Sequence, residues 1–245
     1  TWSTLDLNNI DIKVEELPAK KNRYITFGAF NNFHKLNEET FKLWAKILKN
    51  VDAVILAGGQ SSRMGVPTKA LLQLGNTTLL DRVTRRLACQ VNSLSISGSQ
   101  EYLGNADYPI IEDVVERFSG PLAGLYSAMI CSQVSDSEYL LVVPCDGPFL
   151  PNNLVSELYT QITSEDADIA CVRYQKVNQT TFSLWHRRGL PAIETALITN
   201  NNGGFKSLLS ELTTTYLEWP EEEISPFFNI NTPDDLSLAE AIICR

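Results

Sequence analysis

Histidines and long apolar runs are scarce in this chain. Its 245 residues include only two histidines, His34 and His186, too few for a histidine-based metal cluster. The five cysteines are scattered and include no Cys-x-x-Cys pair, which argues against a zinc site or a disulfide framework and predicts reduced thiols. No run approaches the roughly 18 apolar residues of a membrane span, and no signal peptide is visible. We therefore expect a soluble, cytoplasmic protein without a membrane partner.

Positive charge is also in deficit. The formal net charge is −9 and the calculated pI is about 4.8. A broad surface for a nucleic-acid phosphate backbone needs clustered Lys and Arg, so we expect no nucleic-acid partner. A small cationic pocket remains compatible with this balance.

Short apolar segments alternate with helical stretches, which predicts an α/β fold with a mostly parallel sheet flanked by helices. We expect strands at Ala53–Leu56, Ser93–Ser97, Pro109–Ile111, Tyr139–Val143, Asp168–Val172 and Phe182–Trp185. We expect helices at Leu79–Gln90, Pro121–Cys131, Asn153–Ile162, Leu190–Thr199, Phe205–Glu211 and Pro233–Ile243.

A glycine-rich loop, LAGGQSSRMG from Leu56 to Gly65, follows the first of these strands. It lies at a strand's carboxyl end, where open α/β sheets bind ligands. The backbone amides of Gly58 and Gly59 could contact a polyphosphate, and Arg63 and Lys69 would add positive charge. The alternative is an ordinary glycine-rich turn, but this spacing favours a phosphate site. Neither the P-loop nor the Gly-x-Gly-x-x-Gly pattern is present.

Three further motifs follow in order: GPLAG at 120–124, PCDGPF at 144–149 and FNINTPDDL at 228–236. Together with the glycine loop they resemble the molybdenum cofactor guanylyltransferases, the MobA family, over residues 53–245. The resemblance implies a Rossmann-like nucleotidyltransferase fold, of the type found in nucleotide-diphospho-sugar transferases. It also implies transfer of GMP from GTP to molybdopterin with release of pyrophosphate, and Mg²⁺ as the cofactor.

The same resemblance assigns roles to individual residues. Those implied as catalytic are Arg63, Lys69 and Asp146, with Asp146 as the magnesium ligand. Those implied to bind the nucleotide are Leu56, Ala57, Gly58, Gly59, Lys69, Ser97, Asp113, Gly120 and Asp146. Ser97 occupies a place where part of the family carries asparagine, which puts base contact there in doubt. For Asp113, a solvated acidic loop is a serious alternative.

The carboxyl-terminal motif carries a helix start. Thr232 is suited to the N-cap, Pro233 to the first helical position and Asp235 to a capping box, so we assign Asp234 and Asp235 to capping before chemistry. Asn229 and Asn231 are the better site candidates, because related sugar-nucleotide enzymes bring an asparagine to the metal from this region.

Residues 1–50 form an appendage ahead of the nucleotidyltransferase domain at 51–245. We expect it to be partly irregular, with a helix near 37–49, and part of it resembles a fragment of O-linked N-acetylglucosamine transferase-like enzymes. No activity follows from so short a fragment.

Other functions stay open at this point. A sister enzyme could use CTP, another nucleotidyltransferase could share the fold, or a non-catalytic scaffold could dock through residues 1–50. The substrates implied are GTP and molybdopterin, with transient contact to molybdenum cofactor insertion proteins or molybdoenzymes. The basic residues Lys176, Arg187, Arg188 and Lys206 could meet a pterin phosphate or form a solvated rim.

Overall fold

The computed structural model describes residues 50–58, 68–104, 106–115, 120–131, 137–200 and 203–244. All of them belong to one compact unit, Glu38–Arg245. The expected appendage at 1–50 and its helix near 37–49 lie outside the described residues, apart from Asn50, and stay predictions. Among the described residues, no helix combines the length and apolar character that a membrane crossing requires.

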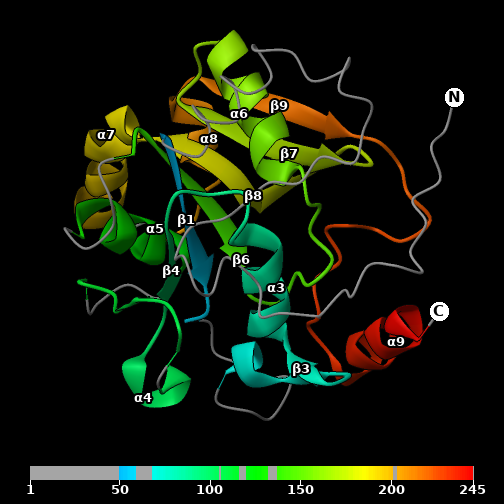
Figure 1. The fold of residues 1–245 in the computed structure, drawn as a ribbon. Coiled ribbons are helices and arrows are strands. Elements are labelled where there is room, and N and C mark those ends of the chain that lie inside the picture. The colour runs from blue at the N-terminus through cyan, green and yellow to red at the C-terminus, as the bar shows by residue number, and fades with distance from the viewer. Residues whose placement is uncertain are drawn as a thin grey trace, which may run out of the picture. The chain divides into compact units, whose positions relative to one another are not determined.

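The described residues form a seven-stranded sheet in the order β5-β4-β1-β6-β8-β7-β9 (Figure 1). Its strands are β1 (Val51–Leu56), β4 (Leu94–Ser97), β5 (Ile110–Ile111), β6 (Tyr139–Pro144), β7 (Ile169–Tyr174), β8 (Val177–His186) and β9 (Thr214–Trp219). All neighbouring pairs are parallel except those of β8, which runs antiparallel to β6 and β7. The carboxyl ends of β1, β4 and β6 therefore meet at one edge of the sheet.

Helices cover both faces of the sheet. They are α3 (Leu79–Leu87), α4 (Gln100–Leu103), α5 (Pro121–Ile130), α6 (Leu154–Ser164), α7 (Leu190–Glu194), α8 (Leu208–Glu211) and α9 (Pro233–Ile243). The 3-10 turns η4 (Lys69–Leu71) and η5 (Arg187–Gly189) and the π-helical η6 (Thr195–Thr199), which continues α7, complete the helical elements of the described residues.

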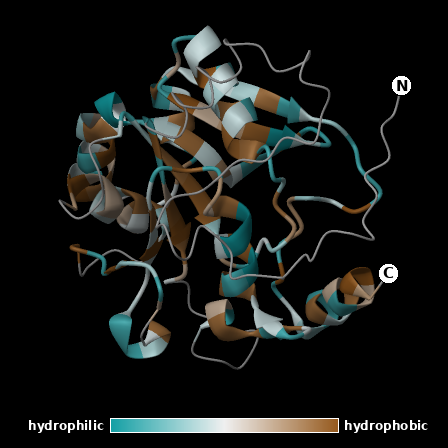
Figure 2. Ribbon diagram, viewed as in Figure 1, coloured by the Kyte–Doolittle hydropathy of each residue, from teal (hydrophilic) through white to brown (hydrophobic). Residues whose placement is uncertain are grey.

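Alternation along the central strands explains this two-faced packing. In β1, Ala53 and Ile55 join α3 and α6 in one apolar cluster, whereas Val54 joins α5, α7 and α8 in the other. Successive side chains of a strand point to opposite faces, so a strand covered on both sides is apolar throughout. Figure 2 shows these central strands as largely hydrophobic, as expected for a buried sheet.

A third, smaller apolar cluster lies beneath α9. It joins that helix to the hairpin formed by β2 (Gln73–Leu74) and β3 (Thr77–Thr78). Its buried members are Leu74, Leu79, Ile230 and Ala239, with Leu72, Phe149, Phe228, Leu236 and Ile243 packed against them. This third cluster anchors η4 and the loop before α9, both of which reach the carboxyl edge of the sheet.

The six expected strands and the α/β class are confirmed, with corrections to several elements. The expected strand Phe182–Trp185 is only the second half of β8, and the strands β2, β3 and β9 were not predicted. The helix expected at Leu79–Gln90 ends at Leu87, and that expected at Phe205–Glu211 is helical only from Leu208. The short helix α4 was also missed.

Candidate active site

The ends of β1, β4 and β6 are held together by backbone hydrogen bonds. The amide of Cys145, just past β6, donates to the carbonyl of Leu56 at 3.0 Å, and the amide of Ala57 donates to the carbonyl of Ser97 at 2.7 Å. Parallel pairing thus extends one residue beyond β1. The first residues of the glycine loop and the residues after β6 lie side by side at this edge.

Thr68 fixes the start of η4 against this edge. Its hydroxyl accepts a hydrogen bond from the Ala70 amide at 3.2 Å, which caps the turn. The same hydroxyl donates to the carbonyl of Ala57 at 3.4 Å. Lys69, the first residue of η4, therefore begins next to the end of β1.

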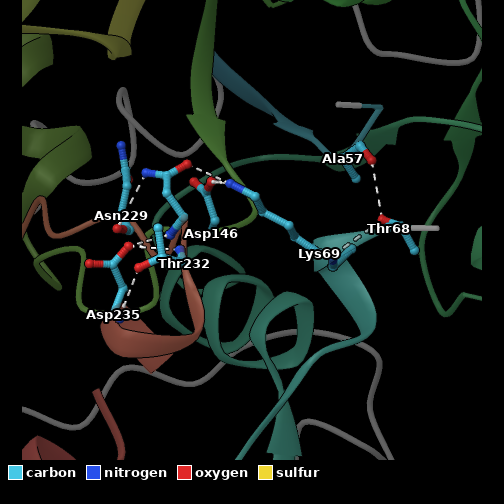
Figure 3. A network of polar contacts seen from close by, with 9 residues as sticks. Ala57, Thr68, Lys69, Asp146, Asn229, Thr232 and Asp235 are labelled. Carbon is cyan, nitrogen blue, oxygen red and sulfur yellow. Dashed lines mark hydrogen bonds and ion pairs between the residues drawn. The ribbon is translucent and has the colours of Figure 1, made fainter. Parts of the chain in front are cut away.

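The Lys69 ammonium contacts oxygen atoms of two segments that are distant in the sequence, and Figure 3 shows its contact with Asp146. Its Nζ lies 2.9 Å from Oδ2 of Asp146 and donates to Oδ1 of Asn231 at 2.5 Å. The Lys69 and Asp146 side chains are only 17% and 15% exposed, so this ion pair is shielded from most of the solvent. The structure thus brings Lys69 and Asp146 into contact, and their joint role in a site stays a prediction.

Asp235 holds the loop that carries Asn231. One carboxylate oxygen, Oδ2, accepts from the amides of Asn231 at 2.9 Å and Thr232 at 2.8 Å. The Thr232 hydroxyl in turn accepts from the Asp235 amide, which completes a capping box on α9. The hydrogen bond from the Asn231 amide is the main cause that lowers the pKa of the Asp235 carboxyl group. The lowered pKa keeps this carboxyl group ionised at neutral pH. The predicted capping role is confirmed.

Asn229 contributes an orphaned oxygen. Its Oδ1 is buried and has no hydrogen-bond partner in the described structure. A Cβ atom added to Gly147 would lie 3.2 Å from this oxygen, so it sits beside the residue that follows Asp146. The amide of Ile230 donates to the Asp146 carbonyl at 2.9 Å and ties the two segments together. Burial of an oxygen atom without a partner is unfavourable unless a ligand or a water molecule interacts with it.

Ser97 and Gly124 meet where α5 crosses the end of β4. Ser97 is buried, and a Cβ atom on Gly124 would collide with its Oγ and come within 2.8 Å of Leu56 Cδ2. The glycine thus lets α5 approach the strand ends. Burial of Ser97 beneath α5 favours a packing role at a position where the resemblance implies nucleotide contact.

Gly120 marks a second close approach. A Cβ atom on this residue would lie 2.6 Å from the carbonyl oxygen of Gly203, and the amide of Leu122 donates to the same oxygen at 3.1 Å. Gly120 is also the N-cap of α5, with Pro121 at the first helical position. The GPLAG motif therefore docks on the segment before α8.

The remaining predicted residues are more peripheral or lie outside the described residues. Gly58 is exposed at the edge of the sheet, whereas Gly59 and Arg63 fall in the undescribed range 59–67. Asp113 follows β5 and is exposed, although desolvation still raises the pKa of its carboxyl group. No hydrogen bond or ion pair among the described residues joins it to Lys69.

Arg187 and Arg188 lie at the other end of the strands, next to the amino end of β6. They follow β8, whose last residue, His186, pairs with Tyr139 at the amino end of β6. The Arg188 guanidinium forms ion pairs with Asp166 and Asp168, and Arg187 donates to backbone carbonyls. Both arginines are thus engaged in structural contacts far from the end of β6. Lys176 and Lys206 are exposed.

Neither a reactive Cys145 thiol nor a metal site built from three or more His, Cys, Asp or Glu side chains is present among the described residues. Burial raises the pKa of the Cys145 thiol to about 12, so it stays protonated at neutral pH and is a poor nucleophile. Within the described ranges, no group of three or more His, Cys, Asp or Glu side chains could hold a metal ion. A metal here would need ligands from a substrate, as magnesium takes from nucleotide phosphates.

Comparison of the amino-acid sequence with known protein families identifies the family of this chain. Residues 53–215 match the MobA-like NTP transferase domain. The chain belongs to the MobA-like NTP transferase family. This confirms the resemblance carried by the four motifs. The likeness of residues 1–50 to O-linked N-acetylglucosamine transferase-like enzymes concerns a segment outside this match and stays a prediction.

Individual MobA-like proteins are similar over most of the chain. A molybdenum cofactor guanylyltransferase of Rhodopseudomonas palustris BisB5 is 34% identical over 197 residues, covering 79% of this chain and 94% of the relative. The crystal structure of molybdopterin-guanine dinucleotide biosynthesis protein A from Archaeoglobus fulgidus superposes with a TM-score of 0.67 at 21% identity, covering 79% of this chain and 98% of that one. A 2-C-methyl-D-erythritol 4-phosphate cytidylyltransferase from Thermus thermophilus gives 0.61 at 16% identity, covering 80% and 100%. Both structures confirm the nucleotidyltransferase fold.

Sequence analysis did not predict one hydrogen bond at this site. Asp235 was expected to cap a helix, and the capping box is present, but its second bond to the Asn231 amide was not foreseen. The capping-box spacing predicts only the bond from the N-cap amide, that of Thr232, to the Asp235 carboxylate, so the sequence carries no signal for the Asn231 bond.

Proposed function

We propose that this protein transfers GMP from GTP to molybdopterin, forming the guanine dinucleotide cofactor and pyrophosphate. The observation that carries the proposal is the Lys69 ammonium, held by Asp146 and Asn231 at the carboxyl edge of a parallel sheet. This is where nucleotide ligands bind in such folds. Relatives at 34% identity that bear the name molybdenum cofactor guanylyltransferase support the choice of substrates.

The residues present fit a magnesium ion, which we propose as the cofactor. The Asp146 carboxylate and the orphaned Oδ1 of Asn229 are oxygen ligands of the kind that Mg²⁺ prefers, and they belong to segments joined by a backbone hydrogen bond. Bound there with the nucleotide phosphates, the ion would neutralise their negative charge. The rest of the coordination would come from phosphate oxygens and water.

The chain's own residues would act mainly by placement and charge. Lys69 would leave its ion pair for the departing pyrophosphate, assisted by Arg63 and by the amides of Gly58 and Gly59. A terminal phosphate of molybdopterin would attack the α-phosphorus of GTP in line. No general base is needed, because that nucleophile is already an anion. Catalysis would therefore consist of orientation and electrostatic stabilisation.

Asp113 and Gly120 would line the nucleoside side of the site. We place the reaction in the cytoplasm, a location supported by the five free cysteines.

Transient contact with molybdenum cofactor insertion proteins or molybdoenzymes would deliver the product.

The test is pyrophosphate release from GTP, CTP, ATP and UTP, each with Mg²⁺ and molybdopterin loaded on an acceptor protein. We expect release from GTP alone. Release from CTP would keep the mechanism and change the nucleotide, giving the cytosine dinucleotide form of the cofactor. Failure with every nucleotide, in a folded protein, would contradict the enzymatic proposal and favour a binding role.

A further inference from the structure

We propose that Asp235 is a positioning residue of the active site, which acts on Lys69 through Asn231. The inference rests on the proposed function for its kinetic consequences, but its structural core is independent of the substrate. The connection runs from the Asp235 carboxylate to the Asn231 amide, and from the Asn231 side chain to the Lys69 ammonium. A residue on α9 thereby sets the place of a cation on η4.

Besides the 3.4 Å hydrogen bond that Nδ2 of Asn231 donates to the Asn229 carbonyl, the Asn231 loop is held at three points. The Ile230 side chain is fully buried in the third apolar cluster, and its amide donates to the Asp146 carbonyl. The third point is Asp235, whose Oδ2 accepts from the amides of both Asn231 and Thr232. Since the first two points fix Ile230, the carboxylate is what orients the peptide of Asn231 itself. Its side-chain oxygen then meets Lys69 at 2.5 Å.

A second capping box in the same chain shows what the Asp235 arrangement adds. At the start of α3, the Thr78 hydroxyl accepts from the Asp81 amide at 3.0 Å, and the Asp81 carboxylate accepts from the Thr78 amide at 3.1 Å. These bonds are exposed, and the Asp81 carboxylate makes no further bond among the described residues. Asp235 makes the same capping contacts in a partly buried setting and also binds the preceding amide. The two aspartates therefore share the capping contacts and differ in their burial and in the link to the site.

This difference provides a matched pair of variants. Asp235→Ala and Asp81→Ala each remove one capping carboxylate, so we expect both to lower the melting temperature. Only Asp235→Ala should also lower kcat for pyrophosphate release from GTP, by about tenfold, with a smaller change in KM. The reason is that Lys69 would stabilise charge that develops as pyrophosphate departs. Equal kcat values in the two variants would overturn the proposal.

A double-mutant cycle separates action through Asn231 from a general loss of order. If Asp235 works through Asn231, then Asp235→Ala should cost little more in kcat when Asn231 is already alanine. Additive losses in the Asn231→Ala, Asp235→Ala double variant would mean that Asp235 acts by another route, and would contradict the proposal. Should Asp235→Ala fail to fold, Asp235→Asn serves instead: it keeps an acceptor oxygen but removes the charge that strengthens the bonds to the Asn231 and Thr232 amides, so we expect a smaller loss of kcat in the same direction. An unchanged kcat in folded Asp235→Asn would contradict the proposal.

A measurement that needs no catalytic turnover can separate the positioning role of Asp235 from the proposed reaction. Acetylation of lysine amines, followed by mass spectrometry, reports how firmly Lys69 is held by its two partners. We expect Asp235→Ala to increase the acetylation rate of Lys69 several-fold and to leave exposed Lys176 unchanged, whereas Asp81→Ala changes neither. Unchanged Lys69 labelling in Asp235→Ala would overturn the positioning role even in an active enzyme. Increased labelling in a chain inactive with every nucleotide would support the role and reject only the proposed reaction.

Discussion

The Oδ1 atom of Asn231 accepts a hydrogen bond from Nζ of Lys69, although the two residues are 162 positions apart in the sequence. The same ammonium forms an ion pair with Asp146, 77 positions away. Three separate segments thus meet at one cation, between the end of β6, the turn η4 and the loop before α9.

Removal of the cation should abolish most of the activity. We expect Lys69→Ala to lower kcat for pyrophosphate release by about 10²–10³-fold, the usual loss for one electrostatic stabiliser of a transition state. The exposed Arg85 on α3 provides the control, because this cation forms no hydrogen bond or ion pair with Lys69, Asp146 or Asn231 in the described structure. Circular dichroism should show both variants folded. Near-normal turnover by Lys69→Ala would refute its assigned role.

The metal requirement can be tested on the intact protein and at Asp146. Activity should disappear with excess EDTA and return with Mg²⁺. In Asp146→Asn, we expect the Mg²⁺ concentration for half-maximal activity to rise and kcat to fall by orders of magnitude, because a neutral amide is a weaker magnesium ligand than a carboxylate. Full activity in EDTA would contradict the proposed cofactor.

The crossing of α5 over the strand ends predicts a stability effect. We expect Gly124→Ala to destabilise the protein by about 1–3 kcal/mol, because the new methyl group would overlap Ser97 and Leu56. In Gly58→Ala the methyl group would meet only Gly98, at an ordinary 3.8 Å, so its stability should stay near that of the unaltered protein. Urea denaturation of the two variants measures the difference. Equal midpoints would show that α5 can shift without cost.

The buried thiols predict a pH-dependent labelling pattern. Burial raises the pKa of both Cys145 and Cys171 to about 12, and only the thiolate reacts with iodoacetamide. At pH 8 both should therefore resist labelling in the folded protein, and their reactivity should rise as the pH approaches that pKa. Exposed Cys89 and Cys244 should react at pH 8. Mass spectrometry locates the labels, and rapid modification of Cys171 in folded protein would contradict this picture.

The elements that could be predicted from sequence are those whose signal is local. The buried run of β6 and the capping residues Thr232 and Asp235 were found because apolar continuity and cap chemistry are visible in short windows. The parallel arrangement followed from the alternation of strands and helices. The family motifs supplied Lys69 and Asp146.

The missed elements depend on long-range pairing. Strand β9 is half-buried along most of its length and lies at the edge of the sheet, where pairing with β7 determines its conformation. The first half of β8 is polar and follows a turn in which Gln175 and Lys176 adopt positive φ angles without glycine or asparagine. The usual hairpin signal is therefore absent there. Those two residues remain in an unfavourable backbone region because the flanking strands hold them.

The assembly of the site was only partly predictable for the same reason. Sequence motifs named both Asn229 and Asn231 without distinguishing them. The structure separates their roles, since Asn231 binds Lys69 and Asn229 presents an unpartnered oxygen beside Gly147. Which of two neighbouring side chains faces a given partner depends on the backbone between them, here fixed by Ile230 in the third cluster and by the bond of the Asn231 amide to Asp235.

The contact between Gly120 and Gly203 has a consequence for protein engineering. The carbonyl of Gly203 occupies the space that a side chain at position 120 would need. The sequences of these two segments therefore depend on each other. If the GPLAG loop of a relative were grafted onto this protein to change its substrate, the new loop would have to pack against a segment around Gly203 that did not evolve with it. Successful chimaeras should exchange both segments together, and a library that varies position 120 alone should be depleted of folded members.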